Sequence, residues 1–136
     1  MKDDNCIFCK IIAGDIPSTK LYEDENYVVM FDIGPATKGH ALVIPKDHYA
    51  NLFELPEDIA GGAYVLAKKM ATKMKDKFQA DGVNILQNNG EVAGQTVHHF
   101  HMHIIPRYKG DQGVFAYEPG SPTSEELIAL KKLIEE

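Results

Sequence analysis

The chain has 136 residues, of which 44% are hydrophobic and 25% charged, and its formal net charge is -6 at pH 7. This profile is typical of one globular domain with a real core, so we treat residues 1–136 as a single domain. The acidic balance argues against a protein that holds a nucleic-acid polymer by its phosphates, but it leaves small nucleotides open. No apolar run reaches membrane-spanning length, and residues 1–5 lack the apolar stretch of a signal peptide, so we expect a cytoplasmic protein without a membrane partner.

Cys6 and Cys9 form a C-x-x-C pair near the N-terminus. In a cytosolic chain the thiols are expected to be reduced, and the pair is then a metal half-site, a redox pair or two small hydrophobes. The redox interpretation expects a strand before the motif, but only five residues precede Cys6. The metal interpretation lacks a second C-x-x-C and would need histidines from elsewhere. The apolar residues after the pair predict one short helical turn, which residues 14–17 end.

Short apolar segments rich in β-branched and aromatic residues predict strands at residues 21–23, 27–31 and 41–45. Asp32 leaves the second of these strands before a Gly-Pro loop, where it either caps the turn or binds a sugar hydroxyl. His40 enters the third strand beside a glycine that allows close approach, and His48 follows just past the end of that strand. Polar side chains therefore flank two apolar strands.

A long helix is predicted after Pro56, because a proline followed by two acidic residues is typical of a first turn. Apolar residues then recur at spacings of three and four, which places one stripe on a helix of about six turns. The stripe consists of Ile59, Ala63, Leu66, Met70, Met74 and Phe78. Asp81 and Gly82 are expected to end the helix.

Residues 83–87 predict another strand, and a polar segment with two glycines follows at residues 88–94. Such a loop can present backbone amides and Asn side chains to an anion, or it is only a hairpin connection. Beyond Arg107 the chain is expected to form a loop through Pro122. A final helix then begins near residues 123–126 and carries an apolar stripe, which consists of Leu127, Leu130 and Ile134.

Four of the six histidines lie between Val97 and Arg107. On a strand, side chains alternate between faces, so His99, His101 and His103 would line one face about 6.7 Å apart. The opposite face would carry His98, Phe100, Met102 and Ile104. Pro106 is expected to mark the end of this strand. A row of three imidazoles gains nothing for a structural sheet, and it indicates either metal ligation or nucleophilic and acid–base chemistry.

The histidine row and the Gly-Gln-Thr-Val approach before it resemble the histidine triad (HIT) family, whose motif is His-φ-His-φ-His-φ-φ with φ apolar. The motif corresponds to residues 99–105, and the resemblance extends over residues 6–107, with residues 108–136 as a C-terminal tail and helix. The branch it is most similar to is the Hint-type nucleotide hydrolases, including their bacterial members. The resemblance implies an α+β fold, in which one long helix packs on an antiparallel sheet of about five strands and a C-terminal helix follows. It also implies a homodimer in which two sheets join.

The resemblance further implies an enzyme that hydrolyses purine nucleoside phosphoramidates or related nucleotide conjugates at the α-phosphorus. His101 would attack the phosphorus and form a covalent nucleotidyl-histidine, from which water would release the nucleoside monophosphate. Neutral imidazole is a good nucleophile at pH 7, and its phosphoramidate is labile. His103 would donate to a phosphate oxygen, while His99 and His40 would orient the row and move protons. No metal is needed for this chemistry.

The nucleotide contacts also follow from the resemblance. Asp32 would accept both ribose hydroxyls, and Thr96 would donate to the phosphate. Asn88 would touch the phosphate or the leaving group, and Gln95 is also expected to bind the nucleotide. The residues that would sandwich the base are Ile7, Phe8, Ile11 and Ile33.

Some HIT members and related nucleotidyl transferases hold a structural zinc ion with two cysteines, a downstream histidine and the first histidine of the triad. These positions correspond to Cys6, Cys9, His48 and His99. Two thiolates and two imidazoles suit tetrahedral Zn²⁺. The ion would clamp the N-terminal segment to the catalytic strand, and His99 would then be a ligand rather than a free proton carrier. His98 departs from the family pattern and has no expected role.

Three alternatives stay open at this point. A dinucleoside polyphosphate hydrolase or nucleotidyl transferase uses the same histidine row. A nucleotide-binding scaffold would keep the row with little turnover. A catalytic zinc site built from the row would lose activity outright on chelation, whereas a structural zinc site would lose thermal stability first. The sequence does not fix the leaving group, because that pocket is built from loops and the dimer partner.

Overall fold

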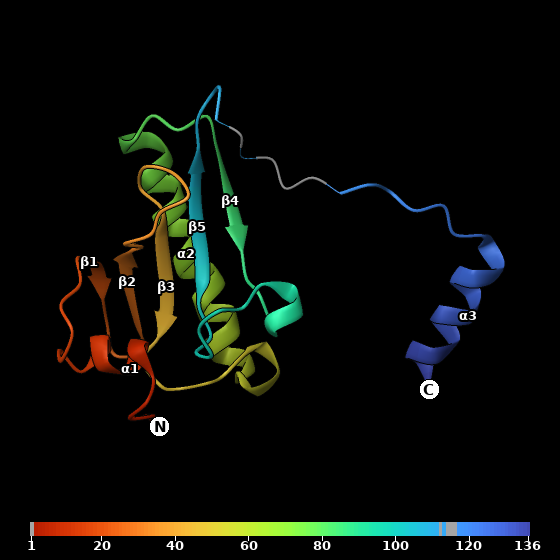
Figure 1. The fold of residues 1–136 in the computed structure, drawn as a ribbon, viewed down its shortest axis with the longest axis horizontal. Helices are drawn as coiled ribbons and strands as arrows, with labels where there is room; N and C mark the ends of the chain where they lie inside the picture. Colours follow the sequence, from red (N-terminus) through yellow and green to blue (C-terminus); the bar gives the residue numbers. More distant parts are fainter. Residues whose placement is uncertain (1, 112, 114–116) are drawn as a thin grey trace.

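The computed structural model describes residues 2–111, 113 and 117–136. Its elements in chain order are α1 (Ile7–Ile12), β1 (Lys20–Glu23), β2 (Tyr27–Phe31), β3 (Ala41–Pro45), the 3-10 helix η1 (Leu52–Glu54), α2 (Glu57–Lys77), β4 (Gly82–Leu86), the 3-10 helix η2 (Glu91–Ala93), β5 (Met102–Arg107) and α3 (Ser124–Glu135). The five strands form one sheet in the order β1-β2-β3-β5-β4, and every neighbouring pair is antiparallel (Figure 1). The predicted α+β fold is confirmed.

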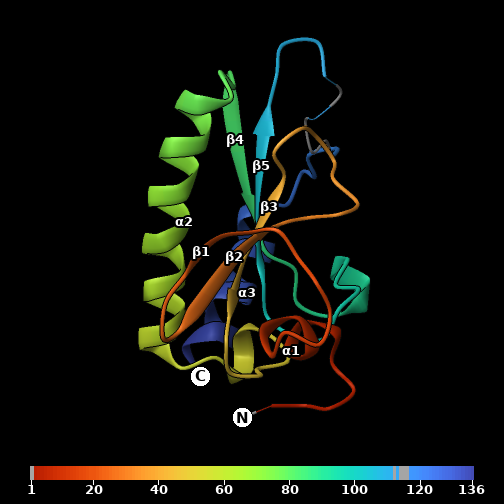
Figure 2. The same ribbon diagram turned by 90° about the vertical axis from the view of Figure 1, so that its left-hand side faces the viewer.

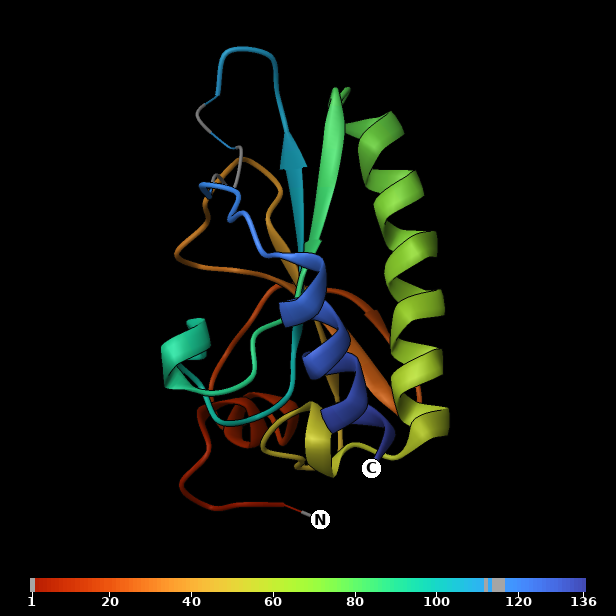
Figure 3. The same cartoon turned by 90° about the vertical axis from the view of Figure 1, so that its right-hand side faces the viewer.

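The sheet carries different elements on its two sides. Helix α2 runs along one face, whereas α1 and η2 lie on the opposite side near one end of the sheet (Figure 2 and Figure 3). The N-terminal segment and the loop that leads into β5 therefore meet on the face that α2 leaves free.

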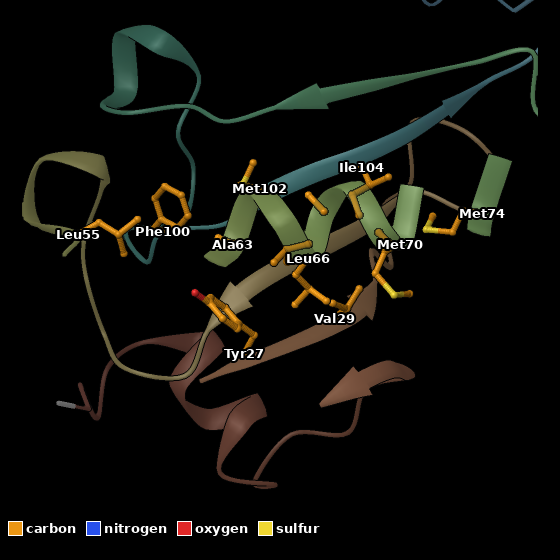
Figure 4. Packing of buried hydrophobic residues seen from close by; sticks show 13 residues of the cluster. Tyr27, Val29, Leu55, Ala63, Leu66, Met70, Met74, Phe100, Met102 and Ile104 are labelled. Atoms are coloured by element: carbon orange, nitrogen blue, oxygen red, sulfur yellow. The ribbon is translucent and has the colours of Figure 1, made fainter. Parts of the chain in front are cut away.

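Strand alternation divides the apolar residues between two cores. In β2, Val29 packs in the cluster beneath α2, whereas Val28 packs in the cluster beneath α1. The antiparallel register pairs Val29 with Val43 and Val28 with Ile44, so β3 continues both clusters. Figure 4 shows the α2-side cluster, in which Leu66, Ala63 and Met70 of the helix face the side chains of the strands.

Helix α2 follows the predicted apolar stripe but ends earlier than expected. The structure places its last residue at Lys77, not at the Asp81-Gly82 pair. Gln79 adopts the left-handed conformation with φ of 55°, and the backbone N–H of Ala80 donates to the carbonyl of Lys75. This is the Schellman arrangement, in which a residue at positive φ closes the last turn. The sequence concealed it because that residue is Gln rather than Gly.

The histidine strand is shorter than expected at its start and longer at its end. β5 begins at Met102, so His99 and His101 lie in the irregular segment before it, which bends at residues 97–99. Pro106 does not end the strand, because it pairs with Val83 inside the β4–β5 ladder. Its carbonyl accepts the hydroxyl of Thr37 at 2.6 Å, so its nitrogen faces the side where β3 has already ended. A proline costs no ladder hydrogen bond on that side.

The C-terminal helix forms as predicted and stands apart from the sheet. Its N-terminus is capped by the Thr123 hydroxyl, which accepts the N–H of Glu126 at 3.2 Å. None of its residues is buried, and Figure 1 shows it beyond the β4 edge. Within the described ranges no helix is both long enough and apolar enough to cross a membrane.

Candidate active site

The last two histidines of the row face the α1 side of the sheet. His103 pairs with Leu42 of β3, whose side chain belongs to the α1-side cluster, while the neighbouring Met102 packs beneath α2. The ring centroids of His101 and His103 lie 5.0 Å apart. The ring of Phe8, from α1, stands edge-on to His101 with the centroids 5.0 Å apart. The alternation expected from the sequence therefore brings these two imidazoles beneath the N-terminal helix.

His101 is held in one tautomer by the backbone. Its Nδ1 lies 2.7 Å from the carbonyl oxygen of His99, and because a carbonyl only accepts, Nδ1 must carry the proton. The other ring nitrogen, Nε2, then keeps its lone pair. Burial lowers the pKa of His101, so the ring is neutral at pH 7. A neutral imidazole with an available Nε2 lone pair is a competent nucleophile.

A chain of hydrogen bonds from Ala36 through His40 fixes the tautomer of His103. The backbone N–H of Ala36 donates to Nδ1 of His40 at 2.9 Å, so Nε2 of His40 carries the proton. That Nε2 lies 2.9 Å from Nδ1 of His103 and donates to it. His103 therefore bears its own proton on Nε2 as a free donor. Burial lowers the pKa of both rings, that of His103 to about 4, so the chain of donors is neutral at pH 7.

Asp32 serves the turn with one oxygen and faces the histidines with the other. Its Oδ1 accepts the N–H of Gly34 at 2.8 Å, and its Oδ2 lies 3.6 Å from Nε2 of His40. Asp32, His40 and His103 place potential metal ligands within 4.8 Å of one another. However, the Nδ1 lone pair of His40 is taken by Ala36 and its Nε2 carries a proton, so His40 has no lone pair left for a metal.

His101, His103 and Asp32 line a cavity of about 250 Å³. Ile7, Phe8 and Ile11 of α1 form one apolar wall, and Ile33 stands at the rim with 98% of its surface exposed. The polar part of the lining consists of Ser18, Asp32, Thr96, His101 and His103. An apolar slot beside a few convergent polar groups is the usual form of a small-molecule site.

Two residues expected to bind the nucleotide do not line this cavity. The Gln95 side chain is buried, and its amide donates to the carbonyls of Ala50 at 2.7 Å and Val97 at 3.0 Å. Its Oε1 accepts the N–H of Gly90 at 2.8 Å. Asn88 lies in the same loop, where its amide is 3.5 Å from the carbonyl of Gly94. Gln95 therefore braces the loop that presents Thr96, and its side chain has no free donor for a ligand.

Ser18 is a lining residue that the sequence did not indicate. Its Oγ is buried and has no hydrogen-bond partner among the described residues. A buried hydroxyl without a partner costs free energy, which a bound ligand can recover. Ser18 lies in a short loop with no periodic pattern, so only the tertiary structure reveals its place.

The four residues expected to bind zinc come together at the other end of the row. Cys6 caps the N-terminus of α1, and its Sγ lies 3.3 Å from Nδ1 of His99. The Sγ of Cys9 lies 3.4 Å from Nδ1 of His48 and 3.6 Å from Nδ1 of His99. The two Nδ1 atoms are 3.2 Å apart. Tetrahedral Zn²⁺ with ordinary bond lengths separates S and N ligands by about 3.5 Å and two N ligands by about 3.4 Å, so the donor set fits zinc.

His99 is committed to this cluster rather than to the cavity. It is fully buried, and its Nε2 donates to the carbonyl of Pro45 at 2.8 Å, which leaves the Nδ1 lone pair for the thiol side. Metal-binding histidines are commonly oriented by such a second hydrogen bond. Burial lowers the pKa of His99 to about 4, which keeps the ring neutral. Both ring nitrogens of His99 are therefore engaged, so its ring has no free nitrogen for the proton transfer expected from the sequence. The contact of His99 with the cavity residues is made by its backbone carbonyl, which holds His101.

Comparisons with known proteins show the family to which this fold belongs. A family model described as "HIT domain" matches residues 13–110. The chain belongs to the HIT family. The protein "Protein hit" of Bacillus subtilis is 56% identical over 109 residues, which cover 79% of this chain and 75% of that protein. The adenosine 5'-monophosphoramidase hnt1 of Schizosaccharomyces pombe is 43% identical over 93% of this chain and 92% of that protein.

Solved structures of HIT proteins superpose on most of the chain. The crystal structure of SMU.412c from Streptococcus mutans UA159 is 42% identical and covers 98% of this chain and 85% of that one, with a TM-score of 0.94. A zinc-bound histidine triad protein from Mycobacterium smegmatis is 40% identical and covers 96% of each chain, with a TM-score of 0.78.

In this HIT protein the extra histidine of the motif lies outside the site. His98 is exposed, and its Nε2 lies 3.8 Å from the carboxylate of Glu91. Surface pairs of this kind contribute little to stability. The structure therefore gives His98 no contact with the cavity or with the cysteine cluster.

Proposed function

We propose that this HIT protein is a nucleotide hydrolase that cleaves at the α-phosphorus, with purine nucleoside 5'-phosphoramidates as substrates. The observation that carries the proposal is the environment of His101, a buried neutral imidazole whose Nδ1–H is held by a backbone carbonyl and whose Nε2 is available. Support for the substrate class comes from relatives in Schizosaccharomyces pombe and Saccharomyces cerevisiae, each 43% identical, which are named adenosine 5'-monophosphoramidases.

In the first step, the Nε2 lone pair of His101 forms a bond to the α-phosphorus as the bond from phosphorus to the amine breaks. The amine takes a proton from water and leaves as ammonia. The covalent intermediate is a nucleotidyl-histidine. The Nε2–H of His103 donates to a non-bridging phosphate oxygen, whose charge grows in the transition state. The hydroxyl of Thr96, which lines the same cavity, donates to the phosphate as well.

In the second step, water attacks the same phosphorus and the bond to Nε2 breaks, which releases the nucleoside monophosphate and returns His101 to its neutral form. The proton lost by the attacking water balances the one taken up by the amine. The carbonyl of His99 holds Nδ1–H through both steps, so the imidazole ring keeps its orientation between attack and release.

The rest of the cavity positions the nucleoside. Asp32 accepts the ribose hydroxyls, and the side chains that sandwich the base are Ile7, Phe8, Ile11 and Ile33. Because the slot is apolar, its preference for purine rests on stacking area rather than on a pattern of hydrogen bonds. Asn88, whose amide lies 3.5 Å from the carbonyl of Gly94, would shape the leaving-group side together with the loop that Gln95 braces.

The cysteine cluster is proposed as a structural zinc site held by Cys6, Cys9, His48 and His99. Bound zinc would supply a cross-link and no catalytic chemistry. This cross-link would hold two parts of the cavity together. Helix α1 provides the wall formed by Phe8, and the segment with His99 supports His101. We also propose that the protein acts as a homodimer, with the two sheets side by side.

Release of AMP from adenosine phosphoramidate tests the proposal, with the wild type and His101→Ala compared before and after brief chelation. We expect release that needs His101 and survives chelation, together with a covalent AMP adduct in acid-quenched wild type only. Release by His101→Ala would refute the mechanism. Immediate loss of release on chelation would favour a catalytic metal. Turnover of dinucleoside polyphosphates alone would change the substrate class, and tight AMP binding without any turnover would indicate a scaffold.

A further inference from the structure

The N-terminal segment before α1 folds over the outer side of the cysteine cluster. The backbone carbonyl of Asp3 accepts the N–H of Cys6 at 3.1 Å, and the N–H of Asp3 donates to the Sγ of Cys9 at 3.5 Å. The carboxylate is held as well, because its Oδ1 accepts the N–H of Asn5 at 2.8 Å. Backbone and side-chain contacts therefore fix Asp3 beside two of the proposed zinc ligands.

The second oxygen of this carboxylate faces His48. Oδ2 of Asp3 lies 3.8 Å from Nε2 of His48. This separation exceeds that of a direct hydrogen bond, so the carboxylate acts on the imidazole through its charge. The side chain of His48 is 19% exposed, whereas His99, the other imidazole of the cluster, is fully buried. Asp3 thus stands beside the more exposed of the two imidazoles, at the ring nitrogen that points away from the cluster.

The position of one proton decides whether His48 can bind a metal. Its Nδ1 lies 3.4 Å from the Sγ of Cys9 and 3.2 Å from the Nδ1 of His99, so this nitrogen must offer its lone pair to a shared ion. In a neutral ring the proton then has to be on Nε2. The negative charge of Asp3 favours that tautomer, because a carboxylate attracts the Nε2–H. In the zinc-free chain the thiol of Cys9 can donate to the free Nδ1.

A hollow of about 270 Å³ leads to the cluster from the same side. Cys9 lines this hollow, and the charged part of the lining consists of Lys2, Asp3, Asp4, Lys10 and Asp15. Of these charged residues, Asp3 is the one whose carboxylate is paired with His48. Its place therefore lies between the opening to solvent and two of the four ligands.

We propose that Asp3 is a positioning residue of the zinc site. Its carboxylate holds His48 in the Nε2–H tautomer, and its backbone N–H supports the sulfur of Cys9 as a thiolate. The inference rests on the proposed structural zinc site and adds a residue outside the four ligands. Loss of a group that orients a metal ligand typically lowers metal affinity by about 10- to 100-fold. A neutral residue at position 3 should therefore weaken zinc binding while the ligand set stays the same.

Competition for zinc tests the effect on the metal. The full-length zinc-bound proteins, wild type and Asp3→Asn, are titrated with a chelator, and the release of zinc is followed in time. We expect Asp3→Asn to bind zinc at least about tenfold more weakly and to release it faster. The matched control is Asp4→Asn, an equal charge change in the same hollow, which should stay within about twofold of wild type.

The outcomes separate this inference from the zinc site itself. Equal zinc affinity in wild type and Asp3→Asn would overturn the role of Asp3 and leave the zinc site in place. An equal loss in Asp4→Asn would also overturn it, because the effect would then be one of general charge. A wild type that binds no stoichiometric zinc would refute the zinc site and the inference together.

Two spectroscopic measurements distinguish positioning from a merely structural role. In the cobalt-substituted proteins, Asp3→Asn should keep the sulfur-to-metal absorption of wild type, because the four ligands are unchanged. In the zinc-free proteins at about pH 8, where imidazole is neutral, long-range ¹H–¹⁵N NMR reports the tautomer of His48. We expect Nε2–H in wild type and a shift towards Nδ1–H in Asp3→Asn. An altered cobalt spectrum, or the same tautomer in both proteins, would contradict the proposal.

Discussion

The two faces of the sheet are built from alternate residues of the same strands, yet they serve different ends. The α2 face is closed by a long helix over an apolar cluster whose buried members come from α2, β2, β3, β5 and the segments beside them. The α1 face has a smaller cluster that contains both cysteines, and it leaves a cavity where His101 and His103 meet α1. Met102 and His103 are consecutive residues of β5, so their side chains point to opposite faces: Met102 to the α2 face and His103 to the cavity on the α1 face.

From this difference we expect stability and chemistry to be separable in this chain. The short helix on the α1 side leaves a cavity that His101 and His103 line, whereas none of the histidines lines the groove beside α2. Substitutions on the α2 side should therefore change the free energy of unfolding with little effect on turnover, and substitutions around the cavity should do the reverse.

The largest effect is expected at His101. His101→Asn should lower kcat for adenosine phosphoramidate by at least about 10³-fold, because the nucleophile is lost. Its free energy of unfolding should change by less than about 1 kcal/mol, and AMP should still bind. Turnover assays, urea denaturation and calorimetry measure the three quantities. A large loss of unfolding free energy in His101→Asn, alongside the loss of kcat, would contradict the comparison between the two faces.

The opposite pattern is expected at Met70, a buried residue of the α2 cluster. Met70→Ala should lower the free energy of unfolding by about 2–4 kcal/mol, since it removes buried methylene groups and leaves a cavity. At a temperature where the variant is folded, kcat should stay within twofold of wild type. Lys68→Ala, on the exposed side of the same helix, is the control for both measurements. A kcat that falls in step with stability would contradict the division.

The cysteine cluster joins the two functions, so its loss should act on stability first. Cys9→Ser should abolish stoichiometric zinc, measured by metal analysis of the purified protein. It should cost at least about 2 kcal/mol, which for a chain of this size lowers Tm by roughly 8 °C. Turnover at low temperature should persist for as long as α1 stays in place. Zinc-free wild type with the same Tm as the holoprotein would refute a structural role.

A smaller effect is expected from pH, through His103. Its folded-state pKa of about 4 lies below the unfolded value of about 6.5, so the unfolded chain takes up the proton first. The stability that His103 contributes above pH 6.5 is therefore lost as the pH falls towards 4. Between pH 7.5 and 5.5 the wild type should lose about 1 kcal/mol more than His103→Gln in urea denaturation.

The smallest effect is expected at Ser18, whose hydroxyl has no partner among the described residues. Ser18→Ala should weaken AMP binding about two- to fivefold, as expected for the loss of one neutral hydrogen bond. The free protein should be as stable as wild type or slightly more stable, because no internal bond is lost. Calorimetric titration and thermal unfolding check both parts. Unchanged AMP affinity would remove Ser18 from the binding surface.

Much of the architecture was predictable because it depends on short-range patterns. The apolar stripe of α2, the β-branched run of β2 and the alternation around His103 each have a period that the backbone imposes. The errors fell where a single residue behaves unusually in its context. Gln79 takes the left-handed conformation that Gly usually provides, and Pro106 stays inside a strand because its nitrogen faces no partner. Neither exception has a signature in the sequence.

By itself the sequence singled out the residues expected to carry the chemistry, since three alternating histidines and a C-x-x-C pair have few structural uses. Only the tertiary structure decided how these residues divide the work. His99 is drawn to the cysteines because Pro45 takes its Nε2, and His101 keeps a free Nε2 because a carbonyl holds its Nδ1. These assignments depend on backbone groups supplied by neighbouring segments. Hydrogen-bond partners are set by three-dimensional proximity, which no local pattern of residues encodes.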